Sequence, residues 1–232
     1  MKKTVLCGFL SLLACIGGTN MGYAVEPTVA LEETFDAFTE GSVDKPAETV
    51  DISATGGKLG QTLSGWTGKQ VYEAGGALMV GSSDILATGQ RYLQTPRMSL
   101  SMLSGNVKVT IRLKALAEYG NLVDVLVGYT TLHQVQLFDN EWHDIVFVTD
   151  RSISGNVKLQ SKLQTSFFID YIKIEQSSSF LLTPEAFRPT DFDGQSFTAS
   201  WARVSGVTSY LLDVYSYGKD NVKEYVKHDE EV

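Results

Sequence analysis

The sequence predicts an all-β fold in which antiparallel sheets pack as a sandwich, and three observations support it. In Asn106–Ala115, apolar residues alternate with lysine, threonine and arginine, so this strand has one buried side and one solvent-facing side. Val123, Val125 and Val127 alternate with their neighbours in the same way. No long stretch carries a 3.6-residue apolar period, so we expect little helix.

The expected strands lie between Leu31 and Glu175, separated by Gly, Ser, Asn and Asp. Short strands at this spacing, with turn residues between them, are typical of one sandwich. In order they are Leu31–Phe38, Gln70–Glu73, Ala77–Val80, Tyr92–Thr95, Val107–Ala115, Leu122–Tyr129, Leu132–Phe138, Trp142–Thr149, Asn156–Gln160 and Ser166–Glu175. Ser104–Asn106 and Ser154–Asn156 repeat one turn sequence, in which glycine supplies a positive φ.

Residues 1–24 have the three parts of a secretory signal peptide. Two lysines are followed by the apolar run Val5–Ile16 and by the small-x-small exit Gly22–Ala24. The apolar run is short for a full membrane span. We therefore predict cleavage after residue 24 and a protein that is secreted or held at the cell surface. Leu12–Cys15 also resembles a bacterial lipobox, so lipid anchoring at Cys15 is the alternative.

The composition of the chain argues against several kinds of binding partner and several kinds of site. Both cysteines, Cys7 and Cys15, lie in the predicted signal peptide, so the mature chain has no disulfide and no cysteine metal site. The net charge is −8, and no cluster of lysine and arginine residues stands out in the sequence. Both observations argue against nucleic acid as a partner. No segment after the signal peptide is apolar enough to be transmembrane.

A second unit is expected after a polar linker at residues 177–183. Residues 184–232 resemble the first half of a fibronectin type III domain, with Pro184 near its start, Ser196–Trp201 as the second strand and Ser209–Tyr215 as the third. The resemblance implies that Trp201 is the core tryptophan. It also implies a truncated fibronectin type III-like β-sandwich, because the remaining strands are absent. We expect either a fragment of a longer protein or some other packing of these residues.

The first unit resembles the jelly-roll domains of secreted Bacteroidetes proteins, which are related to cleaved-adhesin, MAM-like and carbohydrate-binding-module sandwiches. The segments that carry the resemblance are LEETFDAFTEGS, SGWTGKQVYEAGGALMVG, GQRYLQTPRMSLS and SFFIDYIKIEQ, in this order. They cover residues 31–176 and imply a jelly-roll β-sandwich domain at residues 25–176. Such domains bind or adhere, as accessory parts of larger surface proteins or exported enzymes.

Asp170 is the first candidate metal ligand, because it interrupts an apolar strand. Strict alternation places it on one face with Phe168, Ile172 and Ile174. A carboxylate in such a strand is costly to bury unless it is hydrogen-bonded or coordinates a metal. Acceptance of backbone N–H bonds is therefore the alternative to metal binding.

The jelly-roll resemblance implies that Asp170 and an acidic residue of the first strand hold one structural calcium ion. Glu33 and Asp36 lie in that first-strand region, and Gly41 and Ser42 follow with backbone carbonyls. Calcium takes several oxygen ligands of both kinds. A calcium ion here would stabilise the fold and take no part in catalysis.

Three aromatic residues are candidates for a glycan platform, since the apolar face of a sugar stacks on a flat ring. Trp66 lies between Gly65 and Thr67 in an expected loop, and Tyr72 and Tyr92 lie nearby in the sequence. Binding pockets combine aromatic walls with a few polar groups. Large aromatics in sandwiches also serve as core residues, which is the alternative for Trp66.

No catalytic constellation accompanies these candidates. His133 and His143 have no second ligand at metal spacing, and the sequence lacks a Gly-x-Ser-x-Gly elbow and an HExxH motif. We therefore expect a non-catalytic binding or adhesion module whose partner is a glycan or a cell-surface protein. The alternatives are the accessory region of a secreted hydrolase with its catalytic domain outside this chain, or a spacer.

Overall fold

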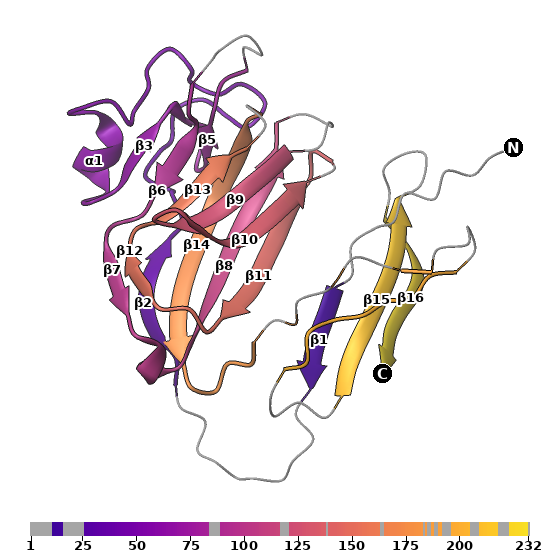
Figure 1. Cartoon of the computed structure of the whole chain (residues 1–232). Helices are drawn as coiled ribbons and strands as arrows, with labels where there is room; N and C mark the ends of the chain where they lie inside the picture. The colour runs from indigo at the N-terminus through magenta and orange to yellow at the C-terminus, as the bar shows by residue number, and fades with distance from the viewer. Residues whose placement is uncertain are drawn as a thin grey trace, which may run out of the picture. The chain divides into compact units, whose positions relative to one another are not determined.

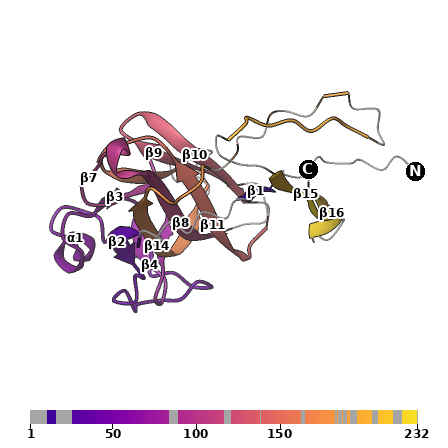
Figure 2. The same cartoon turned by 90° about the horizontal axis from the view of Figure 1, so that it is seen from below.

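The strands of residues 25–180 form two large antiparallel sheets that pack as a sandwich (Figures 1 and 2). The computed structural model describes residues 11–15, 26–83, 89–116, 121–137, 139–162, 165–182, 184, 187, 190–191, 196–204, 209–217 and 223–231. The chain divides into two compact units, one of residues 25–180 and one of residues 1–24 with 181–232. The predicted all-β antiparallel fold is confirmed.

The first sheet has six strands. Its order is β11 (Trp142–Thr149), β8 (Asn106–Ala115), β14 (Phe167–Ser177), β5 (Leu78–Val80) and β4 (Val71–Glu73), and β2 (Thr28–Glu33) also pairs with β14. The long strand β14 therefore lies at the centre, between β8 on one side and β5 with β2 on the other.

The second sheet has five strands. Its order is β10 (Thr130–Leu137), β9 (Asn121–Val127), β13 (Val157–Ser161), β6 (Tyr92–Gln94) and β3 (Thr67–Lys69). A separate two-stranded ribbon pairs β7 (Met98–Leu100) with β12 (Ile153–Gly155). Every pairing in both sheets is antiparallel.

One core fills the space between the two sheets. It takes alternate residues from both, such as Ile111 and Leu113 from β8 and Val123 and Val125 from β9, all fully buried. Each such side chain contributes about 1.5–3 kcal/mol on burial. Since alternate residues face inward, the intervening residues of each strand form the two outer surfaces of the sandwich.

Strand β14 contains a β-bulge at Asp170, whose two neighbours pair with consecutive residues of β8. The bulge reverses the alternation. Before it Phe167 and Ile169 belong to the main core, and after it Ile172 and Ile174 do. The prediction that Asp170 shares a face with Ile172 and Ile174 is therefore wrong, because strict alternation makes no allowance for an extra residue.

The first strand of this unit ends earlier than the predicted Leu31–Phe38, because the chain turns after Glu33. The Glu33 Oε1 atom accepts hydrogen bonds from the backbone N–H groups of Thr34 (3.1 Å) and Phe35 (2.8 Å). Phe35 has a φ of 59°, which no β-strand accommodates. Phe35 and Phe38 are nevertheless fully buried, so the turn carries them into the core.

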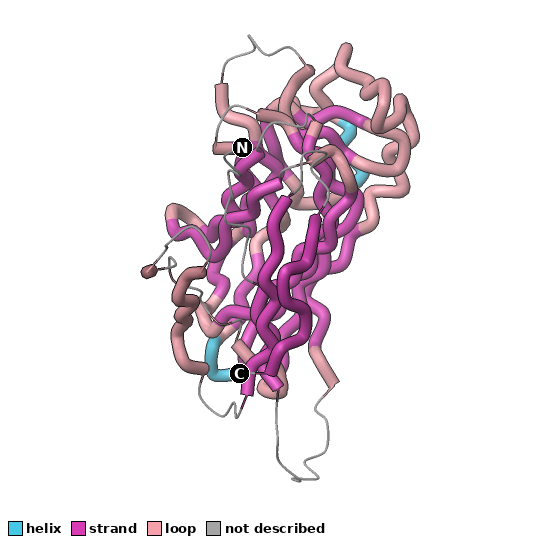
Figure 3. Tube along the Cα trace, turned by 90° about the vertical axis from the view of Figure 1, so that its right-hand side faces the viewer, coloured by secondary structure: helices cyan, strands magenta, loops and turns pink. Residues whose placement is uncertain are grey.

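Helix is limited, within the described residues, to the short α1 (Lys58–Thr62) and one 3₁₀ turn (Met102–Ser104), as Figure 3 shows. The Ser-Gly-Asn turns have the expected positive φ, 110° at Gly105 and 147° at Gly155. Gly105 is also a close contact, because a Cβ there would lie 2.3 Å from the backbone of Ser177. No helix of the described residues is long and apolar enough to span a membrane.

The other unit contains the hairpin of β15 (Ser209–Tyr217) and β16 (Lys223–Glu231), and β1 (Ser11–Cys15) pairs with β15. The rest of the predicted signal peptide lies outside the described residues. Trp201 contacts Tyr210 edge-on at 5.5 Å between ring centroids. In the predicted second strand, Ser196–Trp201, Thr198 forms a bridge with Thr190 and Trp201 is a second bridge residue, with no continuous strand. The fibronectin type III resemblance stays a prediction.

Candidate functional site

The outer face of the five-stranded sheet presents a row of polar side chains around one tyrosine. In β6 the buried Leu93 points to the core, so Tyr92 and Gln94 point outward. The same alternation applies in β13, where Lys158 and Gln160 flank the buried Leu159. The outward residues of the sheet are Gln134, Gln136, Leu122, Asp124, Leu126, Lys158, Gln160, Tyr92, Gln94, Thr67 and Lys69.

Strand register places five of these residues in one line across the sheet. Gln134 pairs with Asp124, Asp124 with Gln160, Gln160 with Tyr92, and Tyr92 with Lys69. The line crosses four strand spacings, or about 19 Å at ~4.8 Å each. It therefore offers amide, carboxylate, aromatic and ammonium groups along a path long enough for an extended ligand.

Contacts among these side chains, and with Lys158 and Lys162, show that they share one face. The Gln134 Nε2 atom donates a hydrogen bond of 2.6 Å to Asp124 Oδ1. The Lys162 Nζ atom lies 3.9 Å from Asp124 Oδ2. The Lys158 Nζ atom lies over the Tyr92 ring, 5.6 Å from its centroid. Apart from Asp124, whose side chain is 15% exposed, we find no carboxylate on this face among the described residues.

Trp66 occupies a different place from Tyr92. It is only 5% exposed and contacts the fully buried Phe35 edge-on, at 5.4 Å between ring centroids. No face of its indole is open for stacking on a sugar. This placement contradicts a ligand contact and fits the alternative, a core residue.

Tyr72 lies on the other sheet, in β4 opposite Met79, within a small apolar cluster that includes Phe168. Burial raises the pKa of the Tyr72 hydroxyl above 10.0, and the charges of Asp51 and Glu48 raise it further. The structure therefore separates the three aromatic candidates, and Tyr92 alone among them stands on the polar outer face.

The predicted calcium ligands are brought only partly together. The Glu33 carboxylate caps the turn after β2, as described above, and Asp36 Oδ2 accepts a hydrogen bond of 2.7 Å from Thr34 Oγ1. Gly41 and Ser42 lie against Gly75, where a Cβ would meet the Gly41 carbonyl oxygen at 2.8 Å. Among the described residues no group of three or more His, Cys, Asp or Glu side chains is arranged to hold a metal ion.

Of these candidates, Asp170 has a carboxylate oxygen without a hydrogen-bond partner among the described residues. Its Oδ1 atom is buried and accepts no hydrogen bond within the described structure. The pKa of the Asp170 carboxyl is raised above its usual value, chiefly by burial. The Arg112 guanidinium opposes this shift, and the negative charges of Asp144 and Asp36 add to it. Burial and the neighbouring negative charges therefore both disfavour the ionised form of Asp170.

Sequence reasoning identified Tyr92 but missed Asp124, Gln134, Gln160 and Lys158. The signal that marks them is the same alternation that predicted the strands, because each stands between two inward-facing residues in β9, β10 or β13. Their assembly depends on strand order, in which β6 lies between β13 and β3. That order is a long-range property that periodicity alone does not determine.

No family model matches the chain, and no curated protein does. Solved structures similar to it include the K1 cleaved adhesin domain of Lys-gingipain from Porphyromonas gingivalis W83, with 13% identity, a TM-score of 0.34, and coverage of 73% of this chain and 99% of that one. Another is the CBM22-1 xylan-binding domain of Xyn10C from Paenibacillus barcinonensis, with 18% identity, a TM-score of 0.31, and coverage of 66% and 97%.

A third is the C-terminal CBM6 of LamC, a laminarinase from Zobellia galactanivorans, with 15% identity, a TM-score of 0.31, and coverage of 43% and 99%. Carbohydrate-binding modules and an adhesin domain are thus among the similar solved structures, all of them at low identity. The likeness concerns the β-sandwich fold alone.

Proposed function

We propose that this chain is an exported, non-catalytic module that binds a glycan on the outer face of its five-stranded sheet. One observation carries the proposal, the line Gln134–Asp124–Gln160–Tyr92–Lys69 that runs in register across the sheet. Export rests on the signal-peptide pattern of residues 1–24.

The chemistry of this line suits a chain of sugars. Amide groups offer both donors and acceptors, and a carboxylate offers acceptors, so neighbouring hydroxyls of a sugar can be bound in pairs. Tyr92 offers an aromatic ring on which an apolar sugar face can stack. A sheet face that offers these groups in one line across five strands suits an extended polymer better than a small molecule, which needs a concave site.

A glycan array tests this function. The full chain is applied beside the double variant Tyr92→Ala/Gln160→Ala, which removes the ring and the central amide, and beside Thr110→Ala, which lies on the outer face of the other sheet. We expect the wild type and Thr110→Ala to bind the same polysaccharides and the double variant to bind none. Absence of binding to every glycan, or equal binding by all three proteins, would reject the proposed function.

We also propose one structural calcium ion at Asp170 and Asp36, with backbone carbonyls of the loop that contains Gly41 and Ser42. The buried Oδ1 of Asp170 without a hydrogen-bond partner supports this proposal. Oxygen atoms of carboxylates and carbonyls are the ligands that calcium prefers. The ion would neutralise two nearby carboxylates and stabilise the loop against β5, with no role in recognising the glycan.

A further inference from the structure

The outer face of the five-stranded sheet has the opposite charge balance from the protein as a whole. The chain contains 27 acidic residues against 19 lysine and arginine residues, a net charge of −8. On this face, by contrast, three lysines, Lys69, Lys158 and Lys162, stand with one aspartate, Asp124. Lys162 pairs with that aspartate at 3.9 Å, which leaves the other two lysines as excess positive charge.

Lys69 and Lys158 both flank Tyr92. Lys69 is its direct neighbour on β3, and the Lys158 ammonium lies 5.6 Å from the centre of its ring. Within the described part of the chain, neither lysine has a carboxylate within 4.0 Å. A cation–π contact at an exposed site contributes only about 0.5–1 kcal/mol, so an anionic ligand can draw Lys158 away from the ring.

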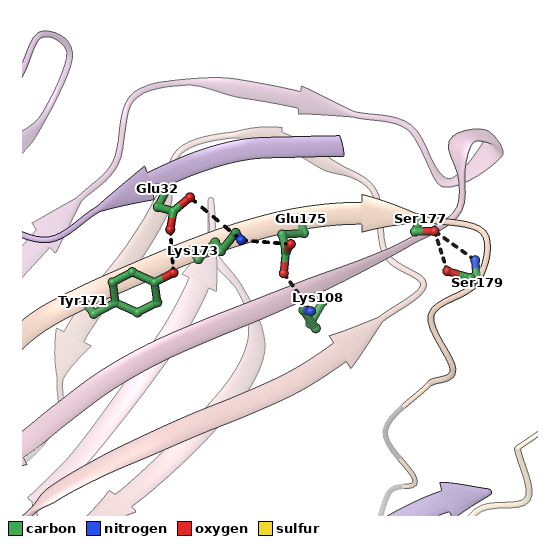
Figure 4. Close-up of polar contacts among 7 residues, drawn as sticks. All are labelled: Glu32, Lys108, Tyr171, Lys173, Glu175, Ser177 and Ser179. Atoms are coloured by element: carbon green, nitrogen blue, oxygen red, sulfur yellow. Dashed lines mark hydrogen bonds and ion pairs between the residues drawn. The ribbon is translucent and has the colours of Figure 1, made fainter. Parts of the chain in front are cut away.

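The outer face of the six-stranded sheet shows that excess positive charge is not general to this fold. There Lys108 contacts Glu175 at 2.7 Å, and Lys173 contacts Glu175 at 3.2 Å and Glu32 at 3.8 Å (Figure 4). On the same sheet Arg112 lies between Asp144 and Asp170, at 3.8 and 3.7 Å. Lysines on that face are mostly neutralised by partners, whereas those around Tyr92 are not.

We propose that the ligand of the Tyr92 face is an anionic polysaccharide, whose carboxylate or sulfate groups pair with Lys69 and Lys158. This inference rests on the proposed glycan-binding function and adds the charge of the ligand. Complementary charge favours an anion on this face, and a hydrogen bond to a charged group is about twice as strong as a neutral one. No basic cluster is visible in the sequence, because Lys69 and Lys158 lie on strands far apart in the chain.

Affinity electrophoresis of the full chain, in gels that contain one polysaccharide each, tests the proposal. Polygalacturonate and alginate carry carboxylates, dextran sulfate carries sulfates, and methyl-esterified polygalacturonate, dextran and laminarin are neutral controls. We expect at least one anionic polysaccharide to retard the protein, and its neutral counterpart to have no effect. The carboxylated and sulfated gels distinguish the two kinds of anion.

Lys158→Gln and Lys69→Gln should each weaken this retardation by roughly tenfold, the change expected for one charge-assisted hydrogen bond. Lys114→Gln, a lysine on the other sheet, is the matched control and should behave as the wild type.

Three results would overturn the inference. Retardation by neutral polysaccharides alone would leave the proposed glycan binding intact and reject the anionic ligand. Retardation by every anion and by a single-stranded oligonucleotide, unchanged in Lys158→Gln and Lys69→Gln, would show unspecific polyanion binding. Retardation by no polysaccharide would reject the proposed function together with the inference.

Discussion

Lys158 lies over the ring of Tyr92, with its ammonium 5.6 Å from the ring centroid, and both side chains stand on the outer face of the five-stranded sheet. The Tyr92 ring is partly exposed, so a ligand can reach it. An aromatic side chain has few rotatable bonds and loses little conformational entropy when a ligand stacks on it.

Substitution of Tyr92 should separate stacking from hydrogen bonding. Tyr92→Phe keeps the ring, so we expect it to retain most of the glycan affinity. Tyr92→Ala removes the ring and should weaken binding by at least roughly tenfold, the equivalent of about 1.4 kcal/mol. Isothermal titration calorimetry with the glycan found on the array measures the affinity of each variant. Equal losses in the two variants would mean that the hydroxyl, and not the ring, carries the contact.

The strands were predictable because their signal is local. Trp142–Thr149 matches its predicted bounds, and Asn106–Ala115 differs from its prediction by one residue. The short strands Thr67–Lys69, Met98–Leu100 and Ile153–Gly155 were missed, because each contains glycine or serine. Equally short strands such as Val71–Glu73 and Leu78–Val80 lack both residues and were predicted.

The site was only partly predictable, because side-chain direction depends on irregularities and on strand order. The bulge at Asp170 turns one extra residue outward, and no feature of a single sequence marks it. The glycine before Trp66 and the threonine after it predict an exposed loop. In the structure, however, the turn at Phe35 places the Phe35 ring against the Trp66 indole in the core. Tyr92 and Lys69 meet because β6 pairs with β3, a relationship that no local pattern contains.

The ion pairs of Glu175 should make the first unit sensitive to acid. Burial raises the pKa of the Glu175 carboxyl, but hydrogen bonds from Lys108 and Lys173 outweigh it and hold the pKa below 4.5. A carboxyl whose pKa is lower in the folded state stabilises the fold above pH 4.5, and this stability is lost as the pH falls through the folded-state pKa. Glu175→Gln should lower the free energy of unfolding at pH 7 by about 1–3 kcal/mol.

Urea unfolding of the wild type and Glu175→Gln between pH 7 and pH 3 measures this effect. The difference between the two proteins should shrink as the pH falls below 4.5, because the wild type loses its ion pairs there. A difference that stays constant over this range would show that the loss comes from packing and not from charge.

The partly buried His133 should also make the first unit less stable as the pH falls, but at a higher pH than Glu175 does. Its ring stacks on that of Phe147, with 4.5 Å between centroids, and burial lowers its pKa below 6.5. Above pH 6.5 the residue is neutral in both states and contributes no pH dependence. As the pH falls below 6.5, the unfolded chain takes up a proton that the folded chain does not, so stability falls until the folded-state pKa is passed.

His133→Phe keeps the stacking on Phe147 and removes the titration. We therefore expect the melting temperature of this variant, relative to the wild type, to rise as the pH is lowered from 7 to 5. Differential scanning fluorimetry across this range measures the difference, and parallel curves for the two proteins would exclude His133 as the cause of the pH dependence.

Trp66→Ala tests whether the indole is a core residue. Removal of a buried tryptophan leaves a cavity beside Phe35 and should lower the free energy of unfolding by about 3–5 kcal/mol. Because Trp66 lies inside the sandwich and Tyr92 outside it, the fraction that remains folded should bind glycan with unchanged affinity. A loss of affinity with unchanged stability would instead place Trp66 in the ligand site.

Asp170→Asn distinguishes a calcium ligand from a buried carboxylate by the sign of its effect. Without metal the substitution removes a charge that burial, Asp144 and Asp36 disfavour, so stability in EDTA should stay the same or rise. With calcium at a hundred times its dissociation constant, the wild type should gain about 2.7 kcal/mol and Asp170→Asn should gain almost nothing. Thermal unfolding of the wild type and of Asp170→Asn, each in EDTA and in excess calcium, measures these differences in stability. If added calcium leaves the wild-type melting temperature unchanged, the orphaned Oδ1 of Asp170 needs a partner other than this ion.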